Sequence, residues 1–422
     1  MATLRQINYH PFRVNIQNDQ VHWTKSNHQN IEGLPQIIWQ DNTTWSEANL
    51  WALEQATSFR SSIKTVRSNM SHLLAYAKWL ESESIDWWQF PDRESERCLN
   101  RFRGALIQAR NSGELAPSTA SQRMAAVIRF YKWARDLGLI STEWPMWKDK
   151  FVGIKLTNQF GLEHTLKVAS TNLAIPNRTV AGPVQLEDGL LPLSVKAMKE
   201  VLNFADENAS KELALMLRIG FFTGLRIGSI TDLKVSTLQN AITVPEVGIK
   251  TISVGPSAYP PVDTKFDVSG SVPIPNELLE MLLDYASSIR RLKRQSLSSE
   301  NDQDLLFLSR FGNNYKADSS SAINVEMSRL RKLGLKSGVT VLRGFYFHRT
   351  RATYATELMK VALNAMPVAD AVEFVKEACL HKDISTTMKY VKFIETSKLM
   401  KEASDAFTEA FMGLSRSKAV NE

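Results

Sequence analysis

Apolar residues recur at helical spacing over much of the chain and predict a mostly α-helical protein. One apolar face repeats about every three to four residues, through Ile63, Val66, Met70, Leu73, Leu74, Ala77 and Leu80. A second amphipathic helix is predicted to begin at Ala116-Pro117-Ser118, because proline is favoured in the first turn of a helix. Its apolar face carries Val127, Phe130, Tyr131, Ala134 and Leu137. We therefore interpret residues 45–140 as a helical domain.

The segments on either side of this domain have little periodicity. Residues 1–44 are polar with scattered aromatic side chains and are interpreted as an N-terminal extension. Within them, Leu34–Trp39 has the composition of a short strand, and a partly ordered extension is the equal alternative. Residues 141–188 contain Pro145, Pro176 and Pro183 with several Gly, Ser and Asn residues. This composition predicts a connector, and therefore a domain boundary.

A different pattern begins at Leu190 and predicts a second domain over residues 189–396. Helices are expected at Val195–Phe204, Lys211–Phe222 and Asn276–Leu297. Between them lie three β-like stretches at Ala241–Val244, Thr251–Val254 and Ser271–Ile274. The predicted fold class is mostly α with a small antiparallel β-sheet. Residues 397–422 are expected to form a tail helix, with apolar side chains at Leu399, Met400, Ala403, Phe407 and Phe411.

Composition narrows the classes of protein only modestly. The net charge of +7 is a mild excess that fits a polyanionic partner without identifying one. Two cysteines, Cys98 and Cys379, cannot build a disulfide framework or a Cys-rich zinc site. The N-terminus lacks the apolar core of a secretory signal, and no apolar run reaches the roughly 20 residues of a membrane helix. We expect a cytoplasmic protein that does not insert into membranes.

Four short motifs stand in order in the second domain and carry the candidate chemistry. They are Thr223-Gly224-Leu225-Arg226, Asp263-Thr264-Lys265, His348-Arg349-Thr350-Arg351, and Cys379-Leu380-His381 with Tyr390 nine residues later. Each residue alone has an ordinary interpretation. Arg226 could cap a helix, Lys265 could be a solvated turn residue, and His381 could be a buried structural histidine. The positions of the histidines favour a catalytic role for these motifs, because only two of the seven lie beyond His164 and both fall within the motifs.

Together the six side chains suit a phosphodiester exchange. A tyrosine hydroxyl can attack phosphorus and form a covalent intermediate. Arginine guanidinium groups stay cationic and match the non-bridging oxygens, where charge develops. A lysine or histidine can donate the proton that the leaving 5′ oxygen requires.

The motifs Thr-Gly-Leu-Arg226, Lys265, His348-x-x-Arg351 and His381 with Tyr390 resemble the signature of tyrosine recombinases of the phage-integrase family. The resemblance covers roughly residues 190–395, and more loosely the helical residues 45–140. It implies a C-shaped clamp around double-stranded DNA, formed by a helical core-DNA-binding domain and a catalytic domain. It also implies a homotetramer on two DNA sites, with a C-terminal segment docked on a neighbouring subunit. No metal, ATP or other cofactor is implied.

The resemblance also assigns roles to the individual residues. Arg226 and Arg351 would hold the scissile phosphate, and Lys265 would be the general acid. His348 and His381 would assist by proton transfer or hydrogen bonding. Tyr390 would attack and form a 3′-phosphotyrosyl link. Phosphate contacts in the helical domain are expected from Arg123, Arg129, Lys132 and Arg135, although a solvated surface is the common alternative for each.

Three positions depart from the family pattern, and two residues compete for roles. The residue three after the first arginine is commonly acidic in the family but is Ser229 here, and the residue after the second arginine is often histidine but is Ala352. Cys379 replaces the first residue of the usual Leu-Gly-His, and Leu380 the glycine. The spacing from Arg351 to His381 is long and predicts an extra turn near 362–369. Tyr354 is the rival nucleophile, and Lys250 is the rival acid.

Two other functions fit the same residues. A type IB topoisomerase or a telomere resolvase would use the same chemistry without exchanging strands between two sites. A DNA-binding factor with a decayed active site belongs to a different class, and the intact set of six residues disfavours it.

Overall fold

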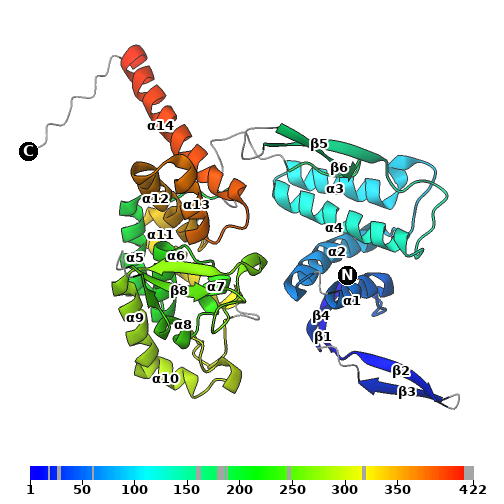
Figure 1. Cartoon of the computed structure of the whole chain (residues 1–422). Helices are drawn as coiled ribbons and strands as arrows, with labels where there is room; N and C mark the ends of the chain where they lie inside the picture. The colour runs from blue at the N-terminus through cyan, green and yellow to red at the C-terminus, as the bar shows by residue number, and fades with distance from the viewer. Residues whose placement is uncertain are drawn as a thin grey trace, which may run out of the picture. The chain divides into compact units, whose positions relative to one another are not determined.

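The computed structural model describes residues 1–17, 20–25, 30–58, 61–157, 163–177, 186, 189–244, 249–315 and 320–412. The chain divides into two compact units, Met1–Val180 and Ala181–Glu422 (Figure 1). The boundary falls inside the segment 141–188 that the sequence marks as a connector. No helix within the described ranges is both long and apolar enough to cross a membrane.

Four long helices form the N-terminal unit: α1 (Ser46–Thr57), α2 (Ile63–Glu83), α3 (Cys98–Asn111) and α4 (Pro117–Asp136). The start of α2 is fixed by Ser62, whose hydroxyl accepts a hydrogen bond from the Thr65 amide. Pro117 occupies the first turn of α4, as the sequence predicts. Most of both predicted apolar faces is buried, although Ile63 and Leu74 are half-buried and Leu137, just past α4, is exposed. The hydroxyls of Tyr76 and Tyr131 lie 2.8 Å apart between the two helices.

Residues 1–44 contribute directly to the core of this unit. Strand β1 (Thr3–Tyr9) pairs antiparallel with β4 (Ile31–Ile38), which includes most of the predicted strand Leu34–Trp39. Leu34 and Ile37 are buried against the helices, in the same apolar cluster as Trp45 and Phe130. The Asn49 side chain completes the contact by hydrogen bonding to both backbone groups of Ile37, at 2.7 and 3.1 Å.

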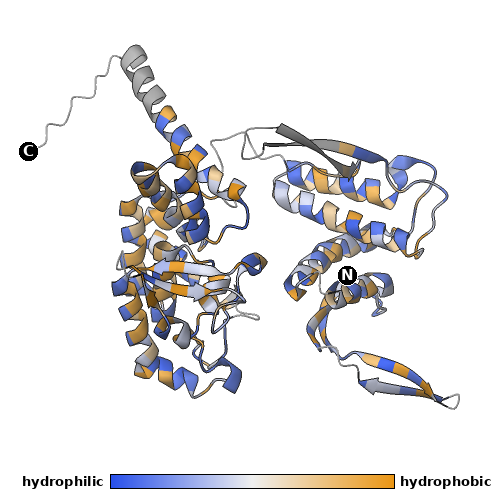
Figure 2. Ribbon diagram, viewed as in Figure 1, coloured by the Kyte–Doolittle hydropathy of each residue, from blue (hydrophilic) through white to orange (hydrophobic). Residues whose placement is uncertain are grey.

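Strands β2 (Phe12–Gln17) and β3 (Gln20–Lys25) form an antiparallel ribbon that projects from this unit (Figure 1). Val14 is paired with Trp23 and Ile16 with Val21, so the apolar side chains share one face. That face is exposed: Trp23 keeps 66% of its accessible surface, and hydrophobic residues alternate with hydrophilic ones along β2 (Figure 2).

The predicted connector contains regular structure that the sequence analysis did not anticipate. Strands β5 (Asp149–Thr157) and β6 (Glu163–Thr171) pair antiparallel in register, from Asp149 opposite Thr171 to Thr157 opposite Glu163. Residues 178–185, which include Pro183, lie outside the described residues. The alternation of Val152, Ile154 and Leu156 with Gly153, Lys155 and Thr157 is the signal for β5, and the prolines on either side obscured it.

The second unit is mostly helical, as predicted. Its longer helices are α5 (Val195–Asn208), α6 (Lys211–Thr223), α9 (Asn276–Ser287), α11 (Ser320–Lys336), α12 (Arg349–Ala365), α13 (Val368–Ala378) and α14 (Ile384–Met412). Short helices α7 (Ile227–Thr231), α8 (Val235–Gln239) and α10 (Ile289–Gln295) lie between them. Ser194 and Ser210 cap α5 and α6 by accepting backbone hydrogen bonds.

One small antiparallel sheet accompanies these helices, in the order β7 (Ile242–Thr243), β8 (Lys250–Val254) and β9 (Gly270–Ile274). The three strands match the three predicted β-like stretches. Ile252 lies opposite Val272, and both are fully buried in the core of the unit. The chain between β8 and β9 extends beyond the sheet and carries Lys265.

Two helices differ from their predicted extent. The single helix expected over Asn276–Leu297 is broken at Ser288, which ends α9 in an extended conformation and caps α10 by accepting from the Arg291 amide. The tail helix is continuous with the helix that carries Tyr390, because α14 runs from Ile384 to Met412. The side chains of Phe407 and Phe411 lie outside the described residues.

Candidate active site

The first motif forms the turn between α6 and α7. Gly224 ends α6 with a φ of +67°, a conformation that glycine adopts without strain. A Cβ atom at this position would lie 2.4 Å from the ring of Tyr354, so the close approach of α12 also requires glycine. Arg226 follows as the half-buried N-cap residue of α7. The turn therefore fixes where the Arg226 side chain begins.

Arg351 connects this turn to the last motif. Its side chain is 2% exposed, and its guanidinium donates from Nη1 to the Gly224 carbonyl at 2.7 Å and from Nη2 to the Cys379 carbonyl at 2.6 Å. A planar guanidinium held at two points has a fixed orientation. Three segments far apart in sequence, at Gly224, Arg351 and Cys379, therefore converge at one side chain.

His348 belongs to the same helix as Arg351. It is the N-cap residue of α12, three residues before Arg351, and its side chain is half-buried. Residues three apart lie on one face of a helix. The predicted His348-x-x-Arg351 pair therefore shares one helix face, with the histidine nearer the surface.

His381 and Tyr390 lie together at the junction of α13 and α14. The two rings are stacked, with centroids 5.9 Å apart and planes 10° from parallel. His381 is 4% exposed, and its Nδ1 atom lies 2.9 Å from the hydroxyl of Thr387. Tyr390 is fully buried, in the apolar cluster that includes Ala352 and Met359. The candidate nucleophile is thus packed inside the unit, under the imidazole.

Lys265 lies at the tip of the connection between β8 and β9. It starts a single 3-10 turn, Lys265–Asp267, in which Phe266 and Asp267 both have positive φ angles. The Lys265 ammonium lies 5.1 Å from the centre of the Phe266 ring, and the ammonium of Lys382 lies 5.5 Å from the same centre. Because Lys382 follows His381 directly, the lysine tip lies beside the His381 loop.

The rival lysine lies at the other end of the hairpin. Lys250 begins β8 and pairs with Ile274, the last residue of β9, whereas the connection that carries Lys265 joins the opposite ends of these strands. Lys265 is exposed and Lys250 is half-buried. The strand geometry therefore separates the two lysines by the length of the hairpin.

The rival tyrosine, Tyr354, lies on α12 beside the turn of the first motif. The ring of Tyr354 packs against Gly224, and burial raises the pKa of its phenol well above the ordinary value.

The departures from the family pattern have structural consequences. Ser229 is buried in α7, so this position offers a hydroxyl where the family commonly has a carboxylate. Ala352 is buried in the same apolar cluster as Tyr390. The extra turn predicted near 362–369 coincides with the break between α12 and α13 at Met366 and Pro367.

The basic residues predicted to contact DNA all lie on α4 but do not form one group. Burial lowers the pKa of the His72 imidazole on α2, and the nearby charges of Arg123 and Arg129 lower it further. Arg129 also donates to the Asn69 side chain at 2.8 Å. At the far end of α4, the Arg135 guanidinium stacks over Trp147 at 5.0 Å and bonds to Asp136. Lys132 is half-buried.

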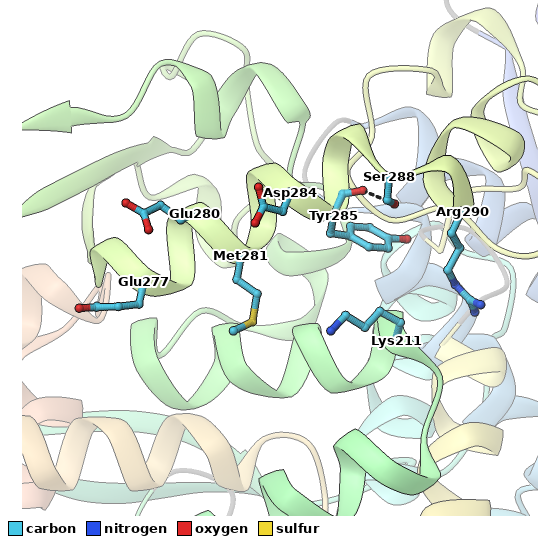
Figure 3. Close-up of a pocket in the computed structure, with 8 residues that line it drawn as sticks. All are labelled: Lys211, Glu277, Glu280, Met281, Asp284, Tyr285, Ser288 and Arg290. Atoms are coloured by element: carbon cyan, nitrogen blue, oxygen red, sulfur yellow. Dashed lines mark hydrogen bonds between the residues drawn. The ribbon is translucent and has the colours of Figure 1, made fainter.

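A surface pocket of about 510 Å³ lies between the start of α6 and helices α9 and α10 (Figure 3). It contains none of the six candidate residues. Its lining includes the carboxylates of Glu277, Glu280 and Asp284, which would repel a phosphate. This pocket is therefore separate from the candidate active site. No group of three or more metal-ligating side chains gathers anywhere in the described ranges.

Comparison with known families agrees with this arrangement. Residues 193–395 match the model of the phage integrase family, and they contain all six candidate residues. This part of the chain belongs to the phage integrase family. It is a tyrosine recombinase domain, the class of enzyme that carries out site-specific recombination.

Three solved structures show the range of similarity to this recombinase. The Tn1549 transposon integrase (residues 82–397, with circular intermediate DNA) is 15% identical, with 85% of this chain and 99% of that chain covered and a TM-score of 0.48. A lambda integrase dimer bound to a core site is 14% identical, with 82% of this chain and 76% of that chain covered and a TM-score of 0.47. The catalytic domain of bacteriophage HP1 integrase is 21% identical, with 51% of this chain and 98% of that chain covered and a TM-score of 0.29. No curated protein matches the sequence.

The structure places three further residues in contact with the candidate site, none of which the sequence analysis singled out. Thr387 contacts the His381 imidazole, Lys382 shares the Phe266 ring with Lys265, and Asp232 contacts the segment before Lys265. Thr387 and Lys382 lie close to the last motif in sequence, which is a usable signal. Asp232 lies 31 residues from its partner Asp263, and only the fold brings them together.

Proposed function

We propose that this protein is a site-specific DNA recombinase that cleaves and rejoins DNA strands through a covalent 3′-phosphotyrosine at Tyr390. In this proposal Arg226 and Arg351 hold the scissile phosphate, and Lys265 protonates the leaving 5′ oxygen. His348 and His381 assist by hydrogen bonding or proton transfer. The phosphotyrosyl link keeps the energy of the broken phosphodiester, so rejoining needs no ATP.

The single observation that supports the proposal best is the pair of hydrogen bonds made by Arg351. By binding the carbonyls of Gly224 and Cys379, this side chain ties together the turn before Arg226, its own helix with His348, and the loop before His381. Preorganised cations and donors at a phosphate are the main catalytic requirement of such a reaction.

The proposal requires a movement of Tyr390. Its ring is fully buried against His381 and the apolar cluster of α12 and α13. A phosphate of double-stranded DNA cannot enter that core, so the start of α14 must shift to present the hydroxyl. We propose that DNA binding stabilises the shifted position of α14. The Tyr390 hydroxyl would then be presented only when DNA is bound.

The proposed assembly follows from the family. The N-terminal unit, with Arg123, Arg129, Lys132 and Arg135 on α4, and the catalytic unit would clamp one DNA duplex. Four copies would hold two recombination sites. The related Tn1549 and lambda integrases were solved with DNA, which supports DNA as the partner of this chain.

A nicked suicide substrate tests the proposed function. The DNA is taken from the junctions joined by the protein in cells that carry its native locus. Wild-type protein should accumulate a covalent protein–DNA adduct, because loss of the short cleaved fragment prevents religation. Tyr390→Phe should bind the DNA equally but form no adduct, whereas Tyr354→Phe should form it normally. An adduct that persists in Tyr390→Phe would refute the assignment of the nucleophile. Absence of any wild-type adduct on the mapped junction would refute the proposed function.

A further inference from the structure

We infer that Asp232 is a positioning residue that holds the Lys265 loop in place for proton donation to the leaving oxygen. This inference rests on the proposed function and concerns a residue outside the set of six. Asp232 ends α7, and its side chain is buried, with 3% of the residue exposed. A buried carboxylate requires strong compensating contacts, so its partners indicate what it holds.

Two contacts of Asp232 lead to the segment just before Lys265. The Oδ2 atom accepts a hydrogen bond from the Asp263 amide at 2.6 Å. The Oδ1 atom lies 2.9 Å from the ammonium of Lys234, and that ammonium donates to the Pro261 carbonyl at 2.6 Å. One carboxylate and one lysine therefore fix the backbone at two points, residues 261 and 263.

The rest of the loop is also closed on itself. Val262 is buried and exchanges two backbone hydrogen bonds with Gly255, at 3.0 and 3.1 Å. The hydroxyl of Thr264 donates to the Val268 carbonyl at 2.7 Å. The turn Lys265–Asp267 lies between Thr264 and Val268, at the tip of this closure. Because Lys265 lies two residues after Asp263, the Asp232 contact limits where its side chain can begin.

The short helix α7 couples this anchor to the phosphate site. Arg226 is the N-cap residue of α7 and Asp232 is its C-cap residue, with five helical residues between them. In the family pattern a carboxylate commonly stands three residues after this arginine, where the present chain has the buried Ser229. The carboxylate on this helix is at Asp232 instead. The helix that positions one phosphate-binding arginine thus also positions the loop of the proton donor.

The expected effect is confined to the proton-transfer step. Without the anchor, the Lys265 ammonium would reach the leaving oxygen in a smaller fraction of complexes. Misplacement of a catalytic group by about 1 Å can cost on the order of 100-fold in rate. DNA binding and attack by Tyr390 do not use Lys265. The defect should therefore disappear when the leaving group needs no proton.

The experiment compares cleavage of ordinary DNA with cleavage of DNA whose 5′ bridging oxygen at the scissile phosphate is replaced by sulfur. A thiolate leaves without protonation, so a variant that lacks only the proton donor recovers on the sulfur substrate. Lys265→Ala is the reference and should show this rescue, whereas Lys250→Ala should be nearly normal on both substrates. Asp232→Ala should cleave ordinary DNA roughly 10- to 100-fold more slowly and recover most of its rate on sulfur DNA.

Two further variants keep the test decisive. Asp232→Asn keeps an oxygen that can accept from the Asp263 amide and loses the charge that pairs with Lys234, so it should fold and show a smaller defect with the same rescue. Asp304→Ala removes another loop-anchoring carboxylate of this unit, which accepts from the Ser236 amide at 3.3 Å and from its hydroxyl. It does not touch the Lys265 loop, so it should cleave both substrates at the wild-type rate. Melting temperature and single-site DNA binding are measured for every variant.

Each outcome separates the inference from the proposed function. If Lys265→Ala is rescued by sulfur but Asp232→Ala and Asp232→Asn are slow on both substrates, the role of Asp232 is structural and the inference is wrong. The same conclusion follows if both Asp232 variants cleave ordinary DNA at the wild-type rate. If Lys265→Ala itself is not rescued, the general acid is assigned wrongly and the inference fails with it. If wild-type protein forms no adduct with either substrate, the proposed function fails.

Discussion

The imidazole of His381 lies over the phenol ring of Tyr390, with centroids 5.9 Å apart and planes only 10° from parallel. Both side chains are buried, and the partner of the imidazole, Thr387, lies three residues before Tyr390 on α14. The orientation of the histidine is therefore coupled to the first turns of α14, the helix that carries the candidate nucleophile. Any shift of α14 that presents Tyr390 must also change the contact between Thr387 and His381.

This coupling predicts the effect of removing the Thr387 hydroxyl. Thr387→Val keeps the volume but leaves the Nδ1 atom of His381 without this partner, so the imidazole should lose its fixed orientation. Adduct formation should slow by roughly tenfold or more. The unfolding free energy should fall by about 1 kcal/mol. The measurement is single-turnover cleavage across a pH series, in which the profile should change shape. Thr387→Ser should behave like wild type, and so should Thr386→Val. A wild-type pH profile in Thr387→Val would contradict the prediction.

Arg351 is expected to be both structural and catalytic. Arg351→Lys cannot reproduce the two hydrogen bonds to Gly224 and Cys379, because an ammonium lacks the planar fork. The catalytic unit should lose roughly 2–3 kcal/mol of unfolding free energy. Adduct formation should fall by about 100-fold or more, since a cation at the phosphate is displaced.

A matched arginine separates these two effects. Arg291 is also buried, in a part of the unit away from the six residues. It donates to the carbonyls of Gln303 and Leu305 at 2.7 and 2.9 Å, and to that of Ala286 at 3.5 Å. Arg291→Lys should lose similar stability while keeping adduct formation at temperatures where it is folded. If both variants cleave equally well when folded, Arg351 has no catalytic role.

Much of the fold could be predicted because its determinants are local. The amphipathic faces of α2 and α4, Pro117 at the start of α4, and the three strands of the small sheet are all encoded within a few residues. The break at Ser288 was missed, because the apolar period continues across it and the serine cap competes with continuation of the helix.

Pairing between distant segments could not be predicted in the same way. Leu4 of β1 pairs with Ile37 of β4, although β2 and β3 separate the two strands in sequence. The burial of β1 and β4 therefore depends on where the chain returns after the ribbon. Phe12, Val14 and Ile16 alternate with polar residues in β2, a pattern that the sequence analysis did not identify.

The candidate site shows the same division. The six residues were identified as motifs, and the structure brings the segments of Arg226, His348, Arg351, His381 and Tyr390 together through contacts of Arg351 and His381. Their catalytic roles stay predictions. The contacts that hold the motifs, Thr387 to His381 and Asp232 to Asp263, come from residues with no distinctive spacing and required the structure.

A buried acid far from the site should make the catalytic unit sensitive to low pH. Glu212 is 1% exposed and accepts from Arg290 at 2.7 and 3.0 Å and from the Tyr285 hydroxyl at 2.9 Å, with Arg294 2.9 Å away. Burial raises the pKa of this carboxyl, but these partners outweigh burial and hold the pKa below its ordinary value of 4.5. A depressed pKa stabilises the folded state above pH 4.5, and this stabilisation is lost as the pH falls through the folded-state pKa.

The matching variant is Glu212→Gln. At neutral pH it should lower the unfolding free energy by about 2–3 kcal/mol, because it leaves two arginines without their carboxylate. The difference from wild type should shrink as the pH falls below 4.5, where wild type also loses the charge. Denaturant unfolding at several pH values measures this difference. A difference that is constant from neutral pH into strong acid would show that the Glu212 charge does not stabilise the unit.

The last prediction concerns assembly through α14. This helix continues past Tyr390 to Met412, and in its described part Leu399 and Met400 keep 64% and 56% of their accessible surface. Apolar side chains at helical spacing on an exposed helix favour contact with another surface. Ending the chain after Thr396 should leave single-site DNA binding nearly unchanged and weaken the pairing of two sites, measured by native gels with one- and two-site DNA. Leu399→Ser with Met400→Ser should weaken pairing in the same direction while keeping the helix. Equal pairing by the truncated and full-length proteins would show that α14 packs only on its own subunit.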